Sequence, residues 1–226
     1  MLKKILLCLS ILIINAAYAD NAELRGGHPF IDLSAGYGYV RTSTGSMSCN
    51  QFSNASSCSS SIGGFDWNIM SGYLFYQNRF AYGGAIGYTS YPNNSYVINY
   101  PNSPSQSLRY KNNYDIDLLG IGKFFITQKF SVLAGLGATY LKQQALANYQ
   151  STSNELVQGT YNNHKIAPTL LVEFIYGITP HISVEISTQY TMVNTLNANS
   201  QSSWTDSFPT EVADTRRTNI GLIYTF

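Results

Sequence analysis

The segment TNIGLIYTF, residues Thr218 to Phe226, decides the fold of this chain. Side chains of a strand alternate between two faces, and one face of this segment is apolar and ends in Tyr224 and Phe226. The opposite face is small or polar, apart from Ile223. A soluble protein usually ends in a frayed polar segment, whereas this chain stops inside an amphipathic strand. The pattern predicts a last strand that pairs with the first strand and closes a barrel.

Residues 1–19 have the three parts of a secretory signal peptide. Lys3 and Lys4 precede an apolar run, which is followed by Ala17-Tyr18-Ala19, with small residues at the two cleavage positions. We expect cleavage after Ala19. The apolar run is shorter than the roughly 20 residues that a membrane-spanning helix needs. No later segment approaches that length without charges or Gly and Asn interruptions, so we expect an exported chain without a membrane helix.

The composition is poor in charge and rich in aromatic residues. Charged residues make up 11% of the chain and aromatic residues 14%, whereas an ordinary soluble domain has about 25% charged residues. The net charge is +1, and no cluster of Lys and Arg is present that could hold a phosphate backbone. We therefore expect no nucleic-acid partner. The length after cleavage suits one domain, with residues 20–29 as a short periplasmic lead and residues 30–226 as a barrel.

Seven more segments alternate as the last one does, and turns of about three residues alternate with long polar segments between them. The seven segments are residues 30–41, 65–76, 80–91, 114–126, 130–142, 164–178 and 182–193. The four long segments, expected to be loops, are residues 42–64, 92–113, 143–163 and 194–215. Prolines in residues 92–113 argue against a central strand there. The sequence thus predicts an all-β fold of eight antiparallel strands in an up-and-down barrel.

A soluble barrel of the lipocalin type also has one apolar face, so the alternation alone does not decide which face points outward. Three further features decide it. Aromatic residues stand at both ends of the apolar face, as Trp67 and Phe75 do, which is typical of the two water interfaces of a bilayer. The opposite face is rich in Gly, Ala, Ser and Thr, which suits the narrow interior of an eight-stranded barrel. The charges within the strands, such as Lys123 and Glu185, also lie on that face. We therefore expect the apolar face to contact lipid, where only a closed barrel satisfies every backbone group.

The signal peptide, the eight amphipathic strands, the alternating connections and the ending Tyr224-Thr225-Phe226 resemble the small bacterial outer-membrane barrels. These include the transmembrane domain of outer-membrane protein A and the opacity-type, porin-like proteins. The resemblance implies that Leu222, Tyr224 and Phe226 form the signal for the barrel assembly machinery, and that outer-membrane lipid and lipopolysaccharide surround the barrel. An even number of strands places both termini beside the short turns, so we expect periplasmic turns and four extracellular loops. The chain ends at the barrel, so a wall-anchoring domain is not expected.

Nine charged residues are predicted to face the lumen, in two levels. The level toward the long segments contains Asp66, Asp115, Asp117, Lys165 and Arg217, and the level toward the short turns contains Asp32, Lys123, Glu173 and Glu185. Buried charges must be paired or neutralised. The two interpretations are a structural plug of ion pairs and a gated polar path. In the level toward the short turns, three acids face one base. This imbalance predicts a water-filled pocket or one carboxyl group that stays protonated.

Cysteine and histidine define the remaining candidate sites. Removal of the signal peptide leaves Cys49 and Cys58, and an even pair in an exported chain predicts a disulfide bond, with two free thiols as the alternative. His28 and His181 fall near the short turns, and His164 near the outer rim has no serine motif beside it. We therefore expect no catalytic site. The histidines are also not at ligand spacing, so we expect no metal site, and no cofactor is expected.

The long segments are rich in Tyr, Asn and Ser and poor in charge, as adaptable binding surfaces are. The alternative is a set of solvated, mobile loops. We expect a structural or surface-interaction role, as an adhesin or ligand-binding protein that contacts an extracellular ligand or a host surface. The second candidate is a narrow, porin-like channel for small solutes. A soluble secreted sandwich is the third.

Overall fold

The computed structural model describes residues 26–41, 55–61, 63–101, 103–150, 156–193 and 214–226. These residues form ten strands. The strands are β1 (Gly26–Arg41), β2 (Ser57–Ser61), β3 (Gly63–Gln77), β4 (Phe80–Ser90), β5 (Asn94–Tyr100), β6 (Ser103–Phe125), β7 (Phe130–Gln150), β8 (Leu156–Gly177), β9 (Ile182–Thr191) and β10 (Asp214–Thr225). The described part of the chain contains no helix that is long and apolar enough to cross a membrane.

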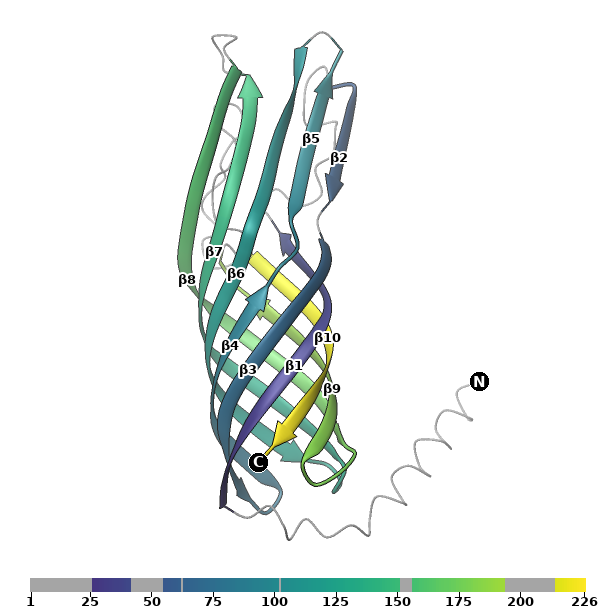
Figure 1. Cartoon of the computed structure of the whole chain (residues 1–226), viewed down its shortest axis with the longest axis vertical. Coiled ribbons are helices and arrows are strands. Elements are labelled where there is room, and N and C mark those ends of the chain that lie inside the picture. The colour runs from purple at the N-terminus through teal and green to yellow at the C-terminus, as the bar shows by residue number, and fades with distance from the viewer. Residues whose placement is uncertain (1–25, 42–54, 62, 102, 151–155, 194–213) are drawn as a thin grey trace, which may run out of the picture.

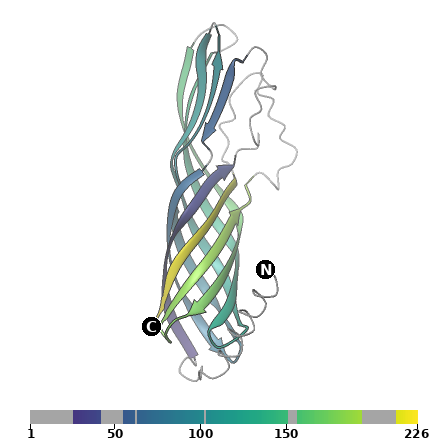
Figure 2. The same cartoon turned by 90° about the vertical axis from the view of Figure 1, so that its right-hand side faces the viewer.

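Eight of the strands form a closed ring, in the order β6-β4-β3-β1-β10-β9-β8-β7, with β7 returning to β6. All neighbours in the ring are antiparallel. The ring closes as the sequence predicts, because β10 pairs with β1 from Phe30↔Thr225 to Arg41↔Asp214. Figures 1 and 2 show the tilted strands and the C-terminus at the end with the short turns. The chain is an eight-stranded antiparallel up-and-down transmembrane β-barrel.

The two faces of the wall are distributed as the alternation predicts. Leu118, Leu136 and Ile220 point outward with exposed fractions of 68%, 67% and 68%. Lys123 and Glu185 point inward and are 7% and 1% exposed. A soluble monomer rarely exposes a large contiguous apolar patch, and the outer wall carries such a surface on every ring strand. The hydrocarbon of a bilayer is the environment that suits it.

Outward-facing aromatic rings form two belts, one near each end of the wall. Near the short turns, Phe80 contacts Phe124 with ring centroids 5.0 Å apart, and Phe130 stacks on Phe174 at 6.5 Å. Near the long connections, Tyr88 lies between Trp67 at 5.4 Å and Tyr114 at 5.7 Å. Aromatic rings collect at the two interfaces of a membrane, so the belts mark the limits of the hydrocarbon region.

The strands β6, β7 and β8 continue far beyond the barrel, which corrects two of the predicted loops. Residues 92–113 and 143–163 were expected to be loops, but most of them extend these strands or form β5. The prolines do not prevent this, because Pro92 lies between β4 and β5, Pro101 lies in the turn that follows β5, and Pro104 is the second residue of β6, close to the start of the strand. We call β2, β5 and the adjoining ends of β6, β7 and β8 the upper sheet. Figure 2 shows it standing on one side of the barrel.

The upper sheet has one buried face and is continuous with the barrel wall. Its largest inward side chains are almost completely buried, namely Tyr96, Ile98, Leu108 and Tyr110. β5 pairs with β6, and β2 pairs with β5, so part of the predicted loop 42–64 is also a strand. Where β6 leaves the barrel, its pairing with β7 shifts between Lys111 and Tyr114, and Asn112 adopts a φ of 51°. A β-bulge of this kind bends a strand and changes its direction.

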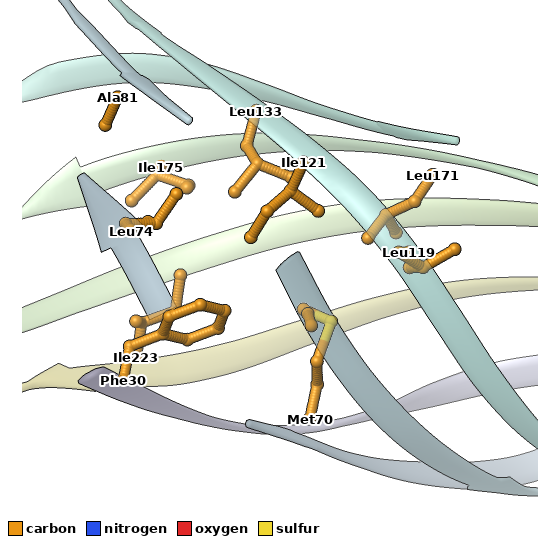
Figure 3. Close-up of a cluster of buried hydrophobic side chains, with 11 residues drawn as sticks. Phe30, Met70, Leu74, Ala81, Leu119, Ile121, Leu133, Leu171, Ile175 and Ile223 are labelled. Carbon is orange, nitrogen blue, oxygen red and sulfur yellow. The ribbon is translucent and has the colours of Figure 1, made fainter. Parts of the chain in front are cut away.

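The interior near the short turns is filled by large apolar side chains, contrary to the prediction of a mainly small and polar lumen. The cluster, which we call the apolar plug, consists of Phe30, Met70, Leu74, Ala81, Ala85, Leu119, Ile121, Leu133, Leu171, Ile175 and Ile223 (Figure 3). Small residues make room for the large ones. A Cβ atom at Gly72 would lie 2.6 Å from the Phe30 ring. Large and small residues therefore interdigitate and close this end of the lumen.

Glycine in the wall offers a test of this packing, because Gly137 faces the lumen whereas Gly122 faces outward. A Cβ atom at Gly137 would lie 2.0 Å from the Leu118 carbonyl oxygen, whereas nothing lies within 4 Å of a Cβ atom at Gly122. We predict that Gly137→Ala destabilises the barrel by about 1–3 kcal/mol, the usual cost of overpacking. Gly122→Ala is the matched control, and we expect little change. Urea unfolding of both variants in phospholipid vesicles measures this, and equal stability of the two would contradict it.

Candidate functional site

The lumen holds eight of the nine predicted charged residues in a buried state. Asp32, Asp66, Asp115, Asp117, Lys123, Glu173, Glu185 and Arg217 are each at most 7% exposed. The ninth, Lys165, also lies on the inner side, opposite Leu141 at the rim, but is only partly buried. The buried set contains six acids and two bases. This imbalance governs the chemistry of the lumen, because a buried charge is costly unless it is paired.

In the part of the lumen nearer the long connections, amide side chains join Arg217 to two carboxylates. Arg217 donates to the Gln189 side-chain oxygen from Nε at 3.1 Å and from Nη2 at 2.7 Å. Gln189 in turn donates from Nε2 to both oxygens of Asp117 at 3.0 Å. On its other side Arg217 donates from Nη1 to Asn219 at 3.1 Å, and Asn219 donates to Asp66 at 2.9 Å, in the amide orientation that satisfies all three. We call these five residues the relay.

A row of threonines extends the relay around the barrel wall. Thr139 donates to Asp117 and also contacts the hydroxyl group of Thr169. Thr169 contacts the hydroxyl group of Thr191 at 2.9 Å. These residues come from β7, β8 and β9, so the row links three strands from inside. The relay and the row together fill this level of the lumen with hydrogen-bonded side chains.

Closer to the plug, Asp32, Glu173 and Glu185 meet in one cluster, which we call the acid triad. They come from β1, β8 and β9, and one carboxylate oxygen of each lies within 4.8 Å of the others. Ser187 donates to Glu185 at 3.2 Å. One oxygen of each of the three carboxylates is buried without a hydrogen-bond partner. Lys123 lies near enough to Glu173 for their charges to interact, with its ammonium group 5.1 Å from the centre of the Phe125 ring.

The two predicted levels are therefore distinct places in the lumen. The structure brings together Asp66, Asp117 and Arg217 in the relay, with Asp115 buried nearby, and it separates Lys165 from them. Gln189 and Asn219, which carry the contacts between the charges, are not singled out by the sequence pattern. The inward position of both side chains follows from the alternation. The contact between Gln189 and Arg217 depends on the register of β9 against β10, which pairs these two residues and cannot be read from the sequence.

The described charges are sorted by sign between the inside and the outside of the barrel. Every Asp and Glu among the described residues is buried. The exposed charges of that part of the chain are all basic, and they include Arg109 and Lys111 near the long connections and Arg79 and Lys129 in the short turns. Among the described residues, the charged side chains exposed on the outer surface are therefore all positive, near the long connections and in the short turns.

The histidines of the described chain belong to the wall. His28 Nδ1 lies 2.7 Å from the carbonyl oxygen of Phe226, and His181 Nδ1 lies 2.8 Å from that of Thr225. His164 stands beside the ring of Tyr140 with centroids 6.1 Å apart. Two histidines therefore hold the end of the closing strand at the short-turn end.

The predicted assembly signal lies on the outer wall beside these histidines. Leu222, Tyr224 and Phe226 are 55%, 45% and 53% exposed. The rings of Tyr224 and Phe226 meet edge to face at 4.9 Å, and that of Tyr224 stacks on His181 at 6.2 Å. Their recognition by an assembly machinery stays a prediction.

Cys58 lies in β2 of the upper sheet and takes part in a disulfide bond. Cys49 falls outside the described residues, so its pairing with Cys58 stays a prediction. The predicted signal peptide and its cleavage after Ala19 also fall outside them.

Comparison with known proteins supports no family assignment. No family model matches the chain, and no curated protein matches it. Among solved structures, Neisserial surface protein A (NspA) is 16% identical with a TM-score of 0.49, covering 89% of this chain and 100% of its own. Ail, the attachment invasion locus protein of Yersinia pestis, solved with the heparin analogue sucrose octasulfate, is 12% identical with a TM-score of 0.47, covering 90% and 100%. The outer membrane protein OprG from Pseudomonas aeruginosa is 11% identical with a TM-score of 0.47, covering 89% and 97%. These values are too low for the likeness to say what this chain binds or does.

The relay makes a quantitative prediction about Gln189. We expect Gln189→Leu to destabilise the barrel by about 3 kcal/mol, because it leaves Arg217 and Asp117 buried without their shared partner. The matched control is Gln144→Leu. Gln144 also bonds to two neighbours, Asn112 at 2.9 Å and Asn162 at 3.2 Å, but these bonds are exposed. We expect its loss to stay within about 0.5 kcal/mol. Urea unfolding in vesicles gives both values, and equal losses would contradict the role assigned to Gln189.

Proposed function

We propose that this chain is a bacterial outer-membrane β-barrel that displays the upper sheet outside the cell as a binding surface, without acting as an enzyme. One observation carries the proposal, which is the length of β6, β7 and β8. They contain 23, 21 and 22 residues, whereas a transmembrane β-strand needs about 9–11. At roughly 3.3 Å per residue, the excess of β6 reaches about 40 Å beyond the membrane. A chain that needed only a membrane anchor would have no use for this extension.

The direction of the upper sheet follows from the topology. Small outer-membrane barrels have short periplasmic turns and long extracellular connections. In this chain the short turns and the C-terminal end of β10 lie at one end of the barrel, and the upper sheet lies at the other (Figure 1). We therefore place the upper sheet and the long connections outside the cell. This orientation puts Leu222, Tyr224 and Phe226 on the periplasmic side, where an assembly machinery would meet them.

The filled lumen opposes the alternative of a narrow channel. The apolar plug closes the end near the short turns, the acid triad lies level with it, and the relay and the threonine row occupy the space above. A solute would have to displace packed aliphatic side chains and break hydrogen bonds to buried charges. Dense packing makes both steps costly. The interior therefore supports a structural role for the charges.

The basic outer surface supports contact with anionic lipid. Arg109 and Lys111 stand on the outward side of β6, close to Lys142 of β7 and His164 of β8, as the pairings Lys111↔Gln144 and Lys142↔His164 show. No acid among the described residues is exposed beside them. Phosphate groups of lipopolysaccharide at the outer interface are the partner whose charge matches. We propose that these residues fix the upper sheet relative to the membrane surface.

The display role can be tested by removing part of the upper sheet. Gln144 and Asn162 are register partners on β7 and β8, so replacing residues 145–161 with Asn-Gly leaves a tight two-residue hairpin on an intact barrel. We expect the wild-type protein in nanodiscs to bind a subset of an array of immobilised glycans and matrix proteins. The shortened variant should lose at least about tenfold of that binding.

The control for this experiment is the barrel itself. Gly122→Ala leaves the upper sheet unchanged and should bind as the wild type does. Folded membrane barrels often migrate differently from their boiled form, so gel mobility before and after boiling reports whether the shortened variant is folded. Full binding by a folded, shortened variant would overturn the proposal.

A further inference from the structure

The acid triad is the part of the lumen that the proposed function does not use. Asp32, Glu173 and Glu185 are each 1% exposed and converge from three strands to within 4.8 Å. The triad lies on the side of the apolar plug where β1, β8 and β9 face one another. Leu171 and Ile175 of the plug flank Glu173 along the inner face of β8. The carboxylates are therefore held close together in a water-poor interior.

Three adjacent carboxylates cannot all be ionised there without compensating positive charge. Like charges at this separation repel strongly where the dielectric constant is low. Lys123 lies beside Glu173, and Arg217 is close enough to interact with all three acids, but these two bases face six buried acids in the lumen. Arg217 is occupied by Gln189 and Asn219 in the relay. The described protein therefore supplies too little positive charge for this cluster.

The unused hydrogen-bonding capacity of the site points to a ligand. Oδ1 of Asp32, Oε2 of Glu173 and Oε2 of Glu185 are buried without partners. The hydroxyl oxygen of Ser34, which is not part of the triad, is also buried and lacks a partner of ordinary hydrogen-bond geometry, although it approaches Glu185. Ser34 is 6% exposed. A Cβ atom added at Gly221 would lie 2.6 Å from the Ser34 Cβ atom and 2.6 Å from Glu185 Oε1. Glycine at this position leaves room for Glu185 beside Ser34.

The ligand that matches these atoms is a hard divalent cation. All the candidate ligand atoms are oxygens, which bind Ca²⁺, Mg²⁺ or Mn²⁺ in preference to the softer metals. Oxygens on opposite sides of a Ca²⁺ ion lie about 5 Å apart, whereas those around Mg²⁺ lie only about 4 Å apart. The triad oxygens all lie within 4.8 Å of one another, so one Ca²⁺ ion between them can contact all three. Three carboxylates that can bind through two oxygens each also suit the high coordination number of Ca²⁺.

We propose that Asp32, Glu173 and Glu185, with the Ser34 hydroxyl group, bind one Ca²⁺ ion inside the barrel. The ion joins β1 to β8 and β9, which are not neighbours of β1 in the ring. The plug and the relay enclose the site, so the ion enters as the barrel folds. The proposal is independent of what the upper sheet binds, and either can fail without the other.

The test compares binding and stability with defined ions. The wild-type protein is unfolded in urea with a chelator and refolded in detergent micelles with Ca²⁺, with Mg²⁺ or with the chelator. We expect equilibrium dialysis with radioactive Ca²⁺ to give one ion per chain. We also expect the midpoint of thermal unfolding to rise in Ca²⁺ and to change much less in Mg²⁺.

Isosteric variants show whether the triad is responsible. Asp32→Asn and Glu173→Gln each remove a charge without changing the shape of the side chain, and each should weaken Ca²⁺ binding at least about tenfold. Asp66→Asn is the matched control, because Asp66 is a buried acid of the relay. It should bind Ca²⁺ as the wild type does. Absence of stoichiometric Ca²⁺ in the wild type, or equal binding by Glu173→Gln, would overturn the proposal and leave protons as the neutralising ligand.

Discussion

The pairing of β10 with β1 is the interaction on which the rest of the structure depends. In the hydrocarbon of a membrane no water is present to satisfy a free N–H or C=O group, so a sheet must have no open edge. The pairing runs the full length of β10 and along most of β1, from Phe30↔Thr225 to Arg41↔Asp214. His28 and His181 add contacts to the carbonyl groups at the end of the closing strand. Once the ring is closed, the wall must be apolar outside, and everything polar on the strands must be accommodated inside.

That requirement explains the two-part interior. An eight-stranded barrel encloses a lumen just wide enough for side chains. Here the apolar plug fills one part of it by packing, and the charged residues fill the other part by hydrogen bonding. The side-chain amides of Gln189 and Asn219 lie between Arg217 and two carboxylates, and they connect these charges by hydrogen bonds. The acid triad has no such arrangement among the described side chains, which is why it stands apart as a place for a cation.

The sequence predicts the wall well because the wall obeys a local rule. Alternation in Thr218 to Phe226 places Ile220 outside and Asn219 inside, and the structure agrees. The upper sheet was missed because its strands are polar and flanked by prolines, although Tyr96 with Ile98 and Leu108 with Tyr110 do alternate with exposed or half-buried neighbours. The plug was missed because glycine dominated the interpretation of the inner face, while Phe30 and Leu171 occupy the space beside Gly72 and Gly135. The triad and the relay depend on register between strands distant in sequence, which no single strand encodes.

The central claim is that the outward aliphatic side chains contact acyl chains. Nitroxide labels on cysteine variants at Leu118, Leu136 and Ile220 test it directly in vesicles, with Asn112→Cys above the barrel as the control. Oxygen concentrates in the bilayer centre, and a polar nickel chelate stays in water. The account predicts that oxygen relaxes the three wall labels far more than the chelate does, with the opposite order at position 112. Stronger relaxation of the wall labels by the chelate would contradict the membrane assignment.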